Sequence, residues 1–331
     1  MKYLIIGAGG TGGAVGSYLA RAGQDVTFIA RGAHLSAMRA NGLRVVRPKD
    51  EFTIPAQAYT MEEYAAAVAD GGIARPDVIF VCVKGYSVDD ALYDFLGCVS
   101  GPETVIIPIL NIYGTGGHMQ KRLPGVCVTD GCIYVAAQIR EPGCIQMNGD
   151  ILRVVFGLRG DEDVSGFAAA DGMPAGAALP ETLLTKLGQI RDELCAAKIL
   201  GIWSEDIRRD ALLKFSYVSP QGACGVFYNV PAGPIQQQGV YRGCFAELVH
   251  EVDVLAEAMG IHFQEDIVAR NLAILDDLGP SATTSMQREI DAGKDSEVDG
   301  LVYEVVRLSE QYGVKLPEYE KIAAAMKERG L

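Results

Sequence analysis

The sequence feature that most constrains the fold is the pattern GxGxxG at residues 7–12, which directly follows a short apolar run at residues 3–6. A strand, a glycine-rich turn and a helix in this order are typical of the first unit of a dinucleotide-binding sheet. In such a unit Gly7 permits the tight turn, Gly9 lets the backbone approach a pyrophosphate, and Gly12 allows close packing of helix on strand. The first N–H groups of the helix then face the anion.

We therefore predict that this loop binds a dinucleotide through Gly7, Gly9, Gly10, Thr11 and Gly12. The alternative is a glycine-rich turn between a strand and a helix that holds no ligand. Three correctly spaced glycines in the correct context favour the dinucleotide site.

The end of the second predicted strand indicates which dinucleotide is bound. An Asp or Glu there would hold the ribose hydroxyls of NAD, but this strand ends in Ile29-Ala30-Arg31, and its only acid, Asp25, stands at the other end. Arg31 is a bidentate donor that matches a 2′-phosphate, and the segment 21–49 carries six basic residues against one acidic residue. The pattern favours NADP(H), with a solvated surface arginine as the alternative.

The first half of the chain alternates short apolar runs with helical patterns, which is typical of a parallel sheet wrapped by helices. Strands are predicted at residues 3–6, 25–30, 77–83 and 104–110, and helices at residues 12–22, 61–69, 87–97 and 114–123. Further strands are predicted at residues 126–136, 143–148 and 151–157, where they would extend the same sheet, and at residues 198–203.

Beyond about residue 205 the apolar residues recur at helical spacing, as in the set Ile207, Ala211, Phe215 and Val218. We therefore predict an α/β protein with a Rossmann-type NADP-binding domain over residues 1–205 and an all-helical substrate-binding and catalytic domain over residues 206–331. Before that boundary, the Ala/Gly-rich residues 163–180 are expected to form part of a helix and a loose loop, and residues 181–197 another helix.

Charge and cysteine content exclude several classes of function. The formal net charge of −13 makes nucleic acid or an anionic membrane surface unsuitable as the main partner, because both need a basic face. We find no apolar run long enough for a signal peptide or a membrane span, so we expect a cytoplasmic protein. Eight cysteines without a CxxC pair indicate reduced core thiols, and four histidines without an HExxH pattern give no support for a metal site.

Together these motifs resemble those of the ketopantoate reductases (2-dehydropantoate 2-reductases). The resemblance rests on the glycine-rich start, an isolated lysine in a helix near the middle, and three further motifs: Val83-Lys84, Pro108-Ile-Leu-Asn111, and Ser285-Met286 followed by Glu297. It covers nearly the whole chain, and the order and spacing of the motifs are specific. The family's organisation, a Rossmann domain followed by a helical domain, agrees with the pattern described above.

The resemblance implies a role for each matching residue. Lys84 and Asn111 would line the cofactor and substrate site at the carboxyl ends of strands, and Lys214 matches the family's catalytic lysine. Ser285 and Glu297 match the pair that assists substrate binding and orientation. Taken singly, each residue has a structural alternative: a solvated lysine, a turn-forming asparagine, a helix cap, or a carboxylate at a helix start.

The expected chemistry explains why these residue types occur together. Hydride transfer to a 2-oxo acid builds negative charge on the carbonyl oxygen, so the site needs a cation that polarises the carbonyl and then donates a proton. Lys214 suits both tasks, and Glu297 would keep it charged and in place. Asn111 and Ser285 suit the substrate carboxylate and hydroxyl. We predict an oxidoreductase that reduces 2-dehydropantoate to pantoate with NADPH, a step of pantothenate biosynthesis.

Two positions depart from the family pattern. Family members commonly carry asparagines four and eight residues after the lysine, where this chain has Val218 and Gly222. Neither side chain forms hydrogen bonds, and a site that loses two donors can change its substrate. The polar residues nearby that would replace these donors are Ser219, Gln221 and Asn229, and the sequence does not choose among them.

Two alternative functions therefore stay open. One is an NADPH-dependent reductase of the same fold that acts on another 2-oxo acid or a ketone. The other is a non-catalytic NADPH-binding regulator, although a regulator would need neither Lys214 nor Glu297. The apolar faces of the helical half suit a homodimer, but they would equally close an internal core.

Overall fold

A computed structural model describes residues 1–160 and 181–331, so most of the Ala/Gly-rich stretch at residues 163–180 lies outside the described residues. The chain divides into two compact units: Met1–Leu110 with Gly114–Ile207, and Asn111–Tyr113 with Arg208–Leu331. Asn111–Tyr113 thus pack with the second unit although they interrupt the first along the chain. That residues 1–205 and 206–331 are separate folding domains stays a prediction.

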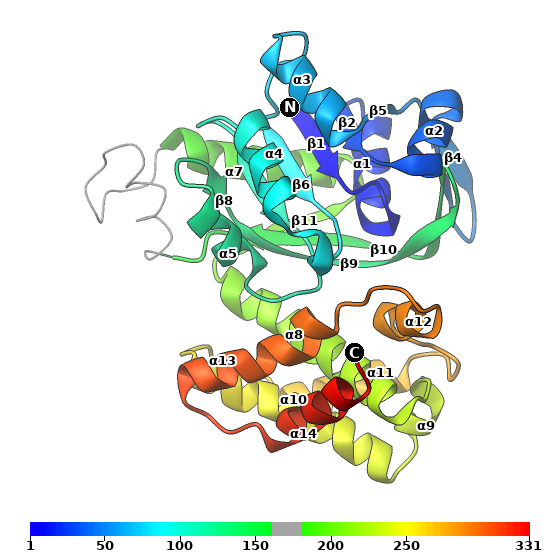
Figure 1. Ribbon diagram of the computed structural model, residues 1–331, viewed down its shortest axis with the longest axis vertical. Helices are drawn as coiled ribbons and strands as arrows, with labels where there is room; N and C mark the ends of the chain where they lie inside the picture. Colours follow the sequence, from blue (N-terminus) through cyan, green and yellow to red (C-terminus); the bar gives the residue numbers. More distant parts are fainter. Residues whose placement is uncertain (161–180) are drawn as a thin grey trace. The chain divides into compact units, whose positions relative to one another are not determined.

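The first unit contains a six-stranded parallel sheet in the order β5-β2-β1-β6-β7-β8 (Figure 1). Its strands are rich in Val, Ile and Phe, and most of their residues are buried, as expected for a sheet covered on both faces. The chain leaves β1 towards β2 on one side and later returns to β6 on the other, so the topological switch point lies between β1 and β6. The bounds are β1 (Lys2–Ile6), β2 (Asp25–Ile29), β5 (Gln57–Tyr59), β6 (Val78–Val81), β7 (Val105–Pro108) and β8 (Cys127–Val128).

Helices α3 and α4 of the first unit begin at side-chain caps. Thr60 and Glu63 form a capping box at the start of α3, and the Asp89 side chain accepts a hydrogen bond from Leu92 N at the start of α4. The bounds are α1 (Gly10–Arg21), α2 (Gly32–Asn41), α3 (Met61–Ala69), the short 3₁₀ segment η1 (Gly85–Ser87), α4 (Asp90–Val99), α5 (Thr115–Arg122) and α7 (Glu181–Ala196).

A second sheet of five strands lies in the same unit, in the order β11-β10-β3-β4 with β9 paired to β10. The prediction that strands after residue 126 extend the parallel sheet is therefore wrong for all but β8. The two segments predicted at residues 143–148 and 151–157 form one strand, which pairs antiparallel with β9 across the tight turn at Gly143 (φ +75°). The bounds are β3 (Leu43–Val46), β4 (Glu51–Ile54), β9 (Asp130–Glu141), β10 (Cys144–Gly157) and β11 (Leu200–Trp203).

Helix α1 contacts strands of both sheets, β1 and β2 of the first and β9 and β10 of the second. Glycines make this close approach possible: a Cβ on Gly13 would lie 2.7 Å from Ile145 Cγ1, and one on Gly16 would lie 2.7 Å from Phe28 Cζ. Because both sheets hold the helix, its glycine-rich N-terminus has a fixed place at the carboxyl end of β1.

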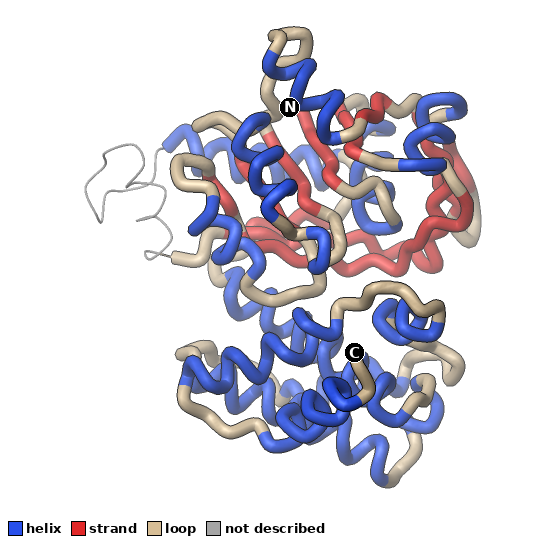
Figure 2. Tube along the Cα trace, in the orientation of Figure 1, coloured by secondary structure: helices blue, strands red, loops and turns tan. Residues whose placement is uncertain are grey.

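The second unit consists of helices and loops in the described chain, as Figure 2 shows. Together with the parallel sheet of the first unit, this confirms the predicted fold class. Buried apolar residues of α10, such as Phe245 and Leu248, belong to the core of this unit. The bounds are α8 (Ile207–Tyr228), α9 (Ala232–Gln236), α10 (Val240–Ala258), α11 (Ile267–Asp276), α12 (Ser285–Asp291), the π-helical segment η2 (Asp299–Tyr303), α13 (Glu304–Tyr312) and α14 (Pro317–Glu328).

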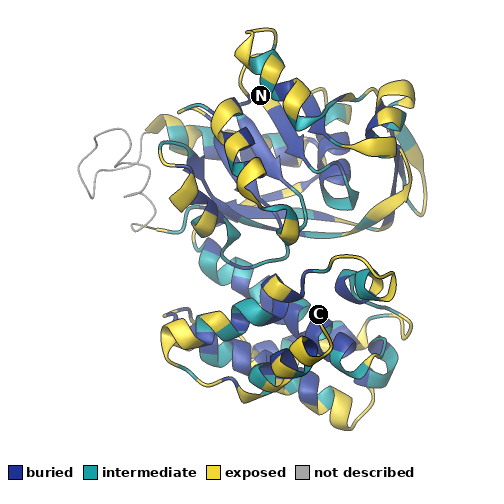
Figure 3. Ribbon diagram, viewed as in Figure 1, coloured by how far each residue is buried: buried dark blue, intermediate teal, exposed yellow. Residues whose placement is uncertain are grey.

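Burial separates the cysteines into groups (Figure 3 shows burial along the chain). All eight are free thiols, and five of them are buried, as predicted for reduced core cysteines. The prediction is wrong for Cys98 and Cys195, which are exposed, and Cys82 is partly buried just after β6. No helix in residues 1–160 or 181–331 is both long and apolar enough to cross a membrane. In the same ranges no group of three His, Cys, Asp or Glu residues is placed to hold a metal ion.

Candidate functional site

The glycines of the loop at residues 7–12 have different surroundings. Gly7 has φ +92°, and a Cβ there would lie 3.0 Å from the Cys82 carbonyl carbon and from Val83 N. A Cβ on Gly12 would lie 2.8 Å from Ile5 Cγ2, whereas a Cβ on Gly9 would meet no atom within 4 Å. Packing within the protein therefore accounts for Gly7 and Gly12. It does not account for Gly9, whose open side matches the close approach of a ligand to the backbone.

The N-terminus of α1 is suited to an anion. Gly9 is its N-cap residue and provides no side chain that would cap the helix, and the first turn contains no acidic residue. Gly13 N donates to Gly9 O at 2.7 Å, so the helix is regular from its first turn. The N–H groups of the first turn, with Gly10 and Thr11, have no carbonyl partner within the helix, and the helix dipole favours negative charge there.

Arg31 follows β2 and is the N-cap residue of α2. It is exposed, and the structure records no hydrogen bond or ion pair for it among the described residues. The other five basic residues of the segment 21–49 have partners: Arg21 lies over the Phe52 ring, Arg39 pairs with Glu63, Arg44 with Glu51 and Glu141, Arg47 with Asp50, and Lys49 with Asp150. Within residues 21–49, Arg31 is therefore the one basic residue without a recorded partner. It lies at the end of β2, where a 2′-phosphate is expected.

Lys84 lies three residues after β6 and directly precedes η1. The residues before it, Cys82 and Val83, contact the position of Gly7, which brings the segment after β6 beside the glycine loop at the switch point. The structure therefore places partly buried Lys84 at the edge of the sheet where dinucleotides bind in this fold.

His34 is a residue of this region that no sequence motif indicates. Its Nε2 lies 2.9 Å from Ala8 O in the glycine loop, and its Nδ1 accepts a hydrogen bond from Gly143 N at 3.0 Å. Because a backbone N–H can only donate, Nδ1 is unprotonated and Nε2–H donates to Ala8 O. Burial lowers the pKa of His34 below its usual value, which favours this neutral form. No motif contains this histidine, because its partners lie 26 and 109 residues away.

In the second unit, the structure brings two predicted residues together. Lys214 Nζ donates to Asn111 Oδ1 at 2.7 Å, although 103 residues separate them in the sequence. Lys214 lies on α8 and only 8 % of its surface is exposed, so it is not the solvated lysine of the alternative interpretation. Tyr113 packs against Phe215, with ring centroids 6.1 Å apart, and this contact helps to hold the segment of Asn111 on α8.

Glu297 and Ser285 belong to the same unit. Glu297 directly precedes the helical segment that begins at Val298, and its backbone oxygen accepts from Leu301 N, so the helix-start position considered for it is confirmed. It is also 3 % exposed, so its carboxylate is buried. Ser285 is the partly buried first residue of α12. The cap of that helix is the neighbouring Thr284, whose Oγ1 accepts from Gln287 N at 3.2 Å, so the helix cap considered for Ser285 is a wrong assignment.

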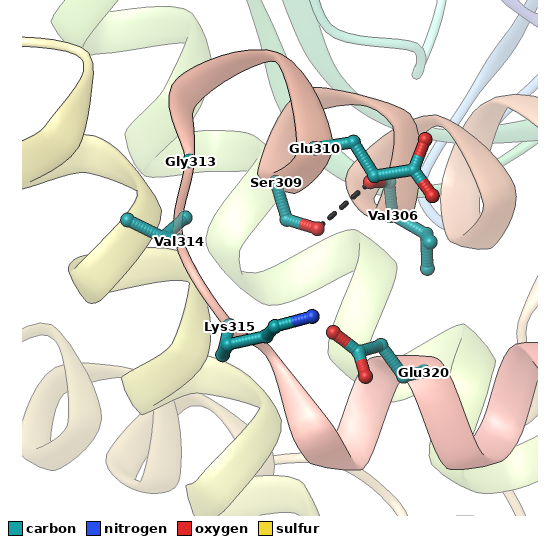
Figure 4. A pocket seen from close by; sticks show the side chains of 7 residues that line it. All are labelled: Val306, Ser309, Glu310, Gly313, Val314, Lys315 and Glu320. Carbon is teal, nitrogen blue, oxygen red and sulfur yellow. Dashed lines mark hydrogen bonds between the residues drawn. The ribbon is translucent and has the colours of Figure 1, made fainter.

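A surface cavity of about 490 Å³ also lies in the second unit, between α13 and α14 (Figure 4). In it the Lys315 and Glu320 side chains point towards one another. It is lined by Val306, Ser309, Glu310, Gly313, Val314, Lys315 and Glu320. None of the predicted site residues lines this cavity, so we assign it no part in the reaction.

Comparison with known proteins gives a consistent result along the chain. Residues 3–160 match the family described as "Ketopantoate reductase PanE/ApbA", and residues 206–330 match its C-terminal part. A curated relative, the 2-dehydropantoate 2-reductase of Mesorhizobium japonicum, is 25 % identical over 100 % of this chain and 99 % of its own length.

Solved structures show the same fold. The PanE/ApbA family ketopantoate reductase from Ralstonia eutropha JMP134 superimposes with a TM-score of 0.81 at 20 % identity, covering 99 % of this chain and 97 % of that one. A D-mandelate dehydrogenase, solved as a ternary complex with NADH and anilino(oxo)acetate, has a TM-score of 0.78 at 18 % identity and covers 97 % of this chain and 96 % of its own.

Proposed function

Because this chain belongs to the ketopantoate reductase family, a family of oxidoreductases, we propose that it reduces a 2-oxo acid to the 2-hydroxy acid with NADPH. The proposed substrate is 2-dehydropantoate, for which the relative from Mesorhizobium japonicum is named. The observation that carries this proposal is the partly buried hydrogen bond from Lys214 Nζ to Asn111 Oδ1, which holds an amine of the kind that polarises a carbonyl oxygen.

Lys214 has the properties of a general acid for this reaction. Its ammonium group has three N–H donors, so an amine that donates to Asn111 is also able to donate to further partners. As the carbonyl oxygen gains negative charge, the ammonium group stabilises it and then donates a proton. Burial strengthens this interaction, because fewer water molecules screen it. Buried Glu297, in the same unit, would balance the charge of the lysine.

The first unit supplies the residues that suit the cofactor. NADPH, when bound, supplies the hydride. The open side of Gly9 and the N-terminus of α1 suit the pyrophosphate, and exposed Arg31 suits a 2′-phosphate. Lys84 follows Cys82 and Val83, which contact the position of Gly7, and it suits a further contact with the dinucleotide.

The test of the catalytic role compares variants of Lys214 by the loss of NADPH absorbance on addition of 2-dehydropantoate. We expect Lys214→Gln to lower kcat by about 10²- to 10⁴-fold, the usual contribution of a general acid, with NADPH affinity nearly unchanged. Asn111→Leu removes the partner of the amine without removing the amine, and we expect a smaller loss. Normal turnover by Lys214→Gln would contradict the proposal, and tight NADPH binding without turnover of any 2-oxo acid would indicate a regulator instead.

The cofactor preference has a separate test. Arg31→Ala should weaken binding of NADPH by about tenfold or more and leave binding of NADH nearly unchanged, because only NADPH carries the 2′-phosphate that the guanidinium group binds. Arg39→Ala is the matched control, since Arg39 already pairs with Glu63. Equal losses for both cofactors in Arg31→Ala would exclude a 2′-phosphate contact.

A further inference from the structure

The face of α8 that carries Lys214 holds a second polar side chain. Seven residues make nearly two turns of an α-helix, so Gln221 projects within about 20° of the direction of Lys214. Gln221 is partly buried, and the structure records no hydrogen bond for its amide within residues 1–160 and 181–331. An amide on this face is therefore available to a ligand that contacts Lys214.

The other two polar residues near positions 218 and 222 are Ser219 and Asn229, and neither presents an uncommitted side chain on the face of Lys214. Ser219 is fully buried, and its hydroxyl donates to Leu301 O at 2.6 Å and lies 2.6 Å from the Tyr319 hydroxyl. Asn229 follows the last residue of α8, is exposed, and has a φ of +53°. Of the three candidates that the sequence leaves open, only Gln221 lies on the face of Lys214 with its amide uncommitted.

Two apolar side chains, Val218 and Met286, lie near Gln221 on this face. Val218 lies one turn after Lys214 and leans towards it, because helical side chains point towards the N-terminus. Gly222 is covered by Met286 of α12: a Cβ at position 222 would lie 2.8 Å from Met286 Cε, and Met286 is fully buried. One turn beyond Gln221, the Gln287 amide of α12 covers Gly225, but this amide already bonds to Thr284 N and Val230 O. The apolar side chains of Val218 and Met286 beside the amide of Gln221 suit a branched apolar body that carries a single polar end.

We propose that Gln221 binds the terminal hydroxyl of the 2-oxo acid and thereby selects hydroxylated substrates over those that end in a methyl group. This inference rests on the proposed function. The amide both accepts from and donates to a hydroxyl, whereas a methyl group would leave its donor and acceptor unpaired beside apolar side chains. Gln221 thus takes the place of the amides that are absent at positions 218 and 222.

The test uses two substrates that differ only in this hydroxyl, 2-dehydropantoate and 3,3-dimethyl-2-oxobutanoate, each with NADPH. We expect the unmodified protein to prefer 2-dehydropantoate by about tenfold or more in kcat/KM, because a site built for a hydroxyl discriminates against its absence. Gln221→Met keeps the length of the side chain and removes the amide. It should lower kcat/KM for 2-dehydropantoate by about tenfold and change that for the other acid by less than about twofold.

Gln311→Met, the same change at an exposed position of α13, is the control and should leave both values unchanged. Turnover of 3,3-dimethyl-2-oxobutanoate by Gln221→Met shows that this variant is folded. An equal loss for both acids, or no loss for either, would overturn the role of Gln221 and leave the proposed function standing. If the unmodified protein oxidises NADPH with neither acid, the proposed function fails and this inference fails with it.

Discussion

Gly9 and Gly12 belong to the same loop, but glycine is needed at the two positions for different reasons. A side chain at Gly12 would press on Ile5 and on the backbone of Gly7, whereas a side chain at Gly9 would meet nothing within 4 Å. Gly9 has φ −72°, which alanine adopts without strain. The loop therefore allows ligand binding to be separated from folding by single substitutions.

We predict that Gly9→Ala weakens NADPH binding by about tenfold or more while the free energy of unfolding stays within about 0.5 kcal/mol of the unmodified value. Gly12→Ala should instead lower the free energy of unfolding by about 1–3 kcal/mol, because the added methyl group overpacks the helix against the strand. Isothermal titration with NADPH and urea unfolding measure the two effects. Unchanged NADPH affinity in Gly9→Ala would show that the open side of this glycine faces no ligand.

The hydrogen bonds of His34 predict that the glycine loop is sensitive to pH. The neutral ring joins Ala8 in the loop to Gly143 in the turn between β9 and β10. Its folded pKa lies below the usual 6.5, so the stability that the neutral ring contributes is complete above pH 6.5 and is lost as the pH falls through the lowered pKa. A proton on Nδ1 would face Gly143 N–H, and the two donors would repel one another.

We therefore predict that both NADPH affinity and protein stability fall as the pH is lowered from 6.5 towards 5. His34→Gln, whose amide can still donate to Ala8 O but does not titrate in this range, should show a flatter profile. Affinity measured by titration at several pH values gives the comparison, and His262→Gln is the control because His262 is exposed and pairs with Glu257. Identical profiles in His34→Gln and the unmodified protein would place the titrating group elsewhere.

At the level of elements, helix α8 contains a proline, and a side chain of another helix replaces the backbone hydrogen bond that the proline removes. Pro220 lies inside the helix and has no N–H, so the carbonyl of Ser216 lacks its helical partner. Fully buried Asn271 of α11 supplies the replacement: its Nδ2 donates to Ser216 O and to Ser216 Oγ, both at 2.9 Å. This bond holds α11 against the helix that carries Lys214.

We predict that Asn271→Leu lowers the free energy of unfolding by about 1–3 kcal/mol, the cost of a buried carbonyl without a partner. In a Pro220→Ala background the helix can form its own bond to Ser216 O, so the same substitution should cost less. Urea unfolding of the four proteins of this cycle measures the coupling between the two residues. Equal costs of Asn271→Leu in both backgrounds would show that Asn271 does not compensate for the proline.

The elements also show what local sequence patterns can predict. The strands and helices around the glycine loop follow from patterns within a few residues, as does the all-helical second unit. The membership of β9 and β10 in a second sheet does not, because it depends on pairing with β3, which lies about a hundred residues earlier. In the same way, only the family resemblance implies roles for Lys214 and Asn111, and no motif indicates His34, because contacts between distant residues leave no local pattern.

For the whole molecule, the two units have separate cores. The large core cluster of the first unit includes residues of both sheets, such as Phe28 and Phe156, while that of the second includes Phe245 and Tyr319. Trp203, the only tryptophan of the chain, lies on β11 and packs against the first of these clusters. Its fluorescence therefore reports unfolding of the first unit, whereas helical circular dichroism reports both units.

We predict that the units unfold in separate transitions and that NADPH shifts only the one reported by Trp203. A ligand at about 100 times its Kd adds about 2.7 kcal/mol to the unit that binds it, which raises Tm by roughly 5–10 °C for a unit of this size. Gly9→Ala should reduce this shift to about half or less, because binding that is tenfold weaker leaves only about 1.4 kcal/mol of stabilisation at the same NADPH concentration while the fold is kept. If fluorescence and circular dichroism instead give one transition that NADPH moves as a whole, the chain unfolds as a single cooperative unit, and a boundary near residue 205 does not separate independent folding domains.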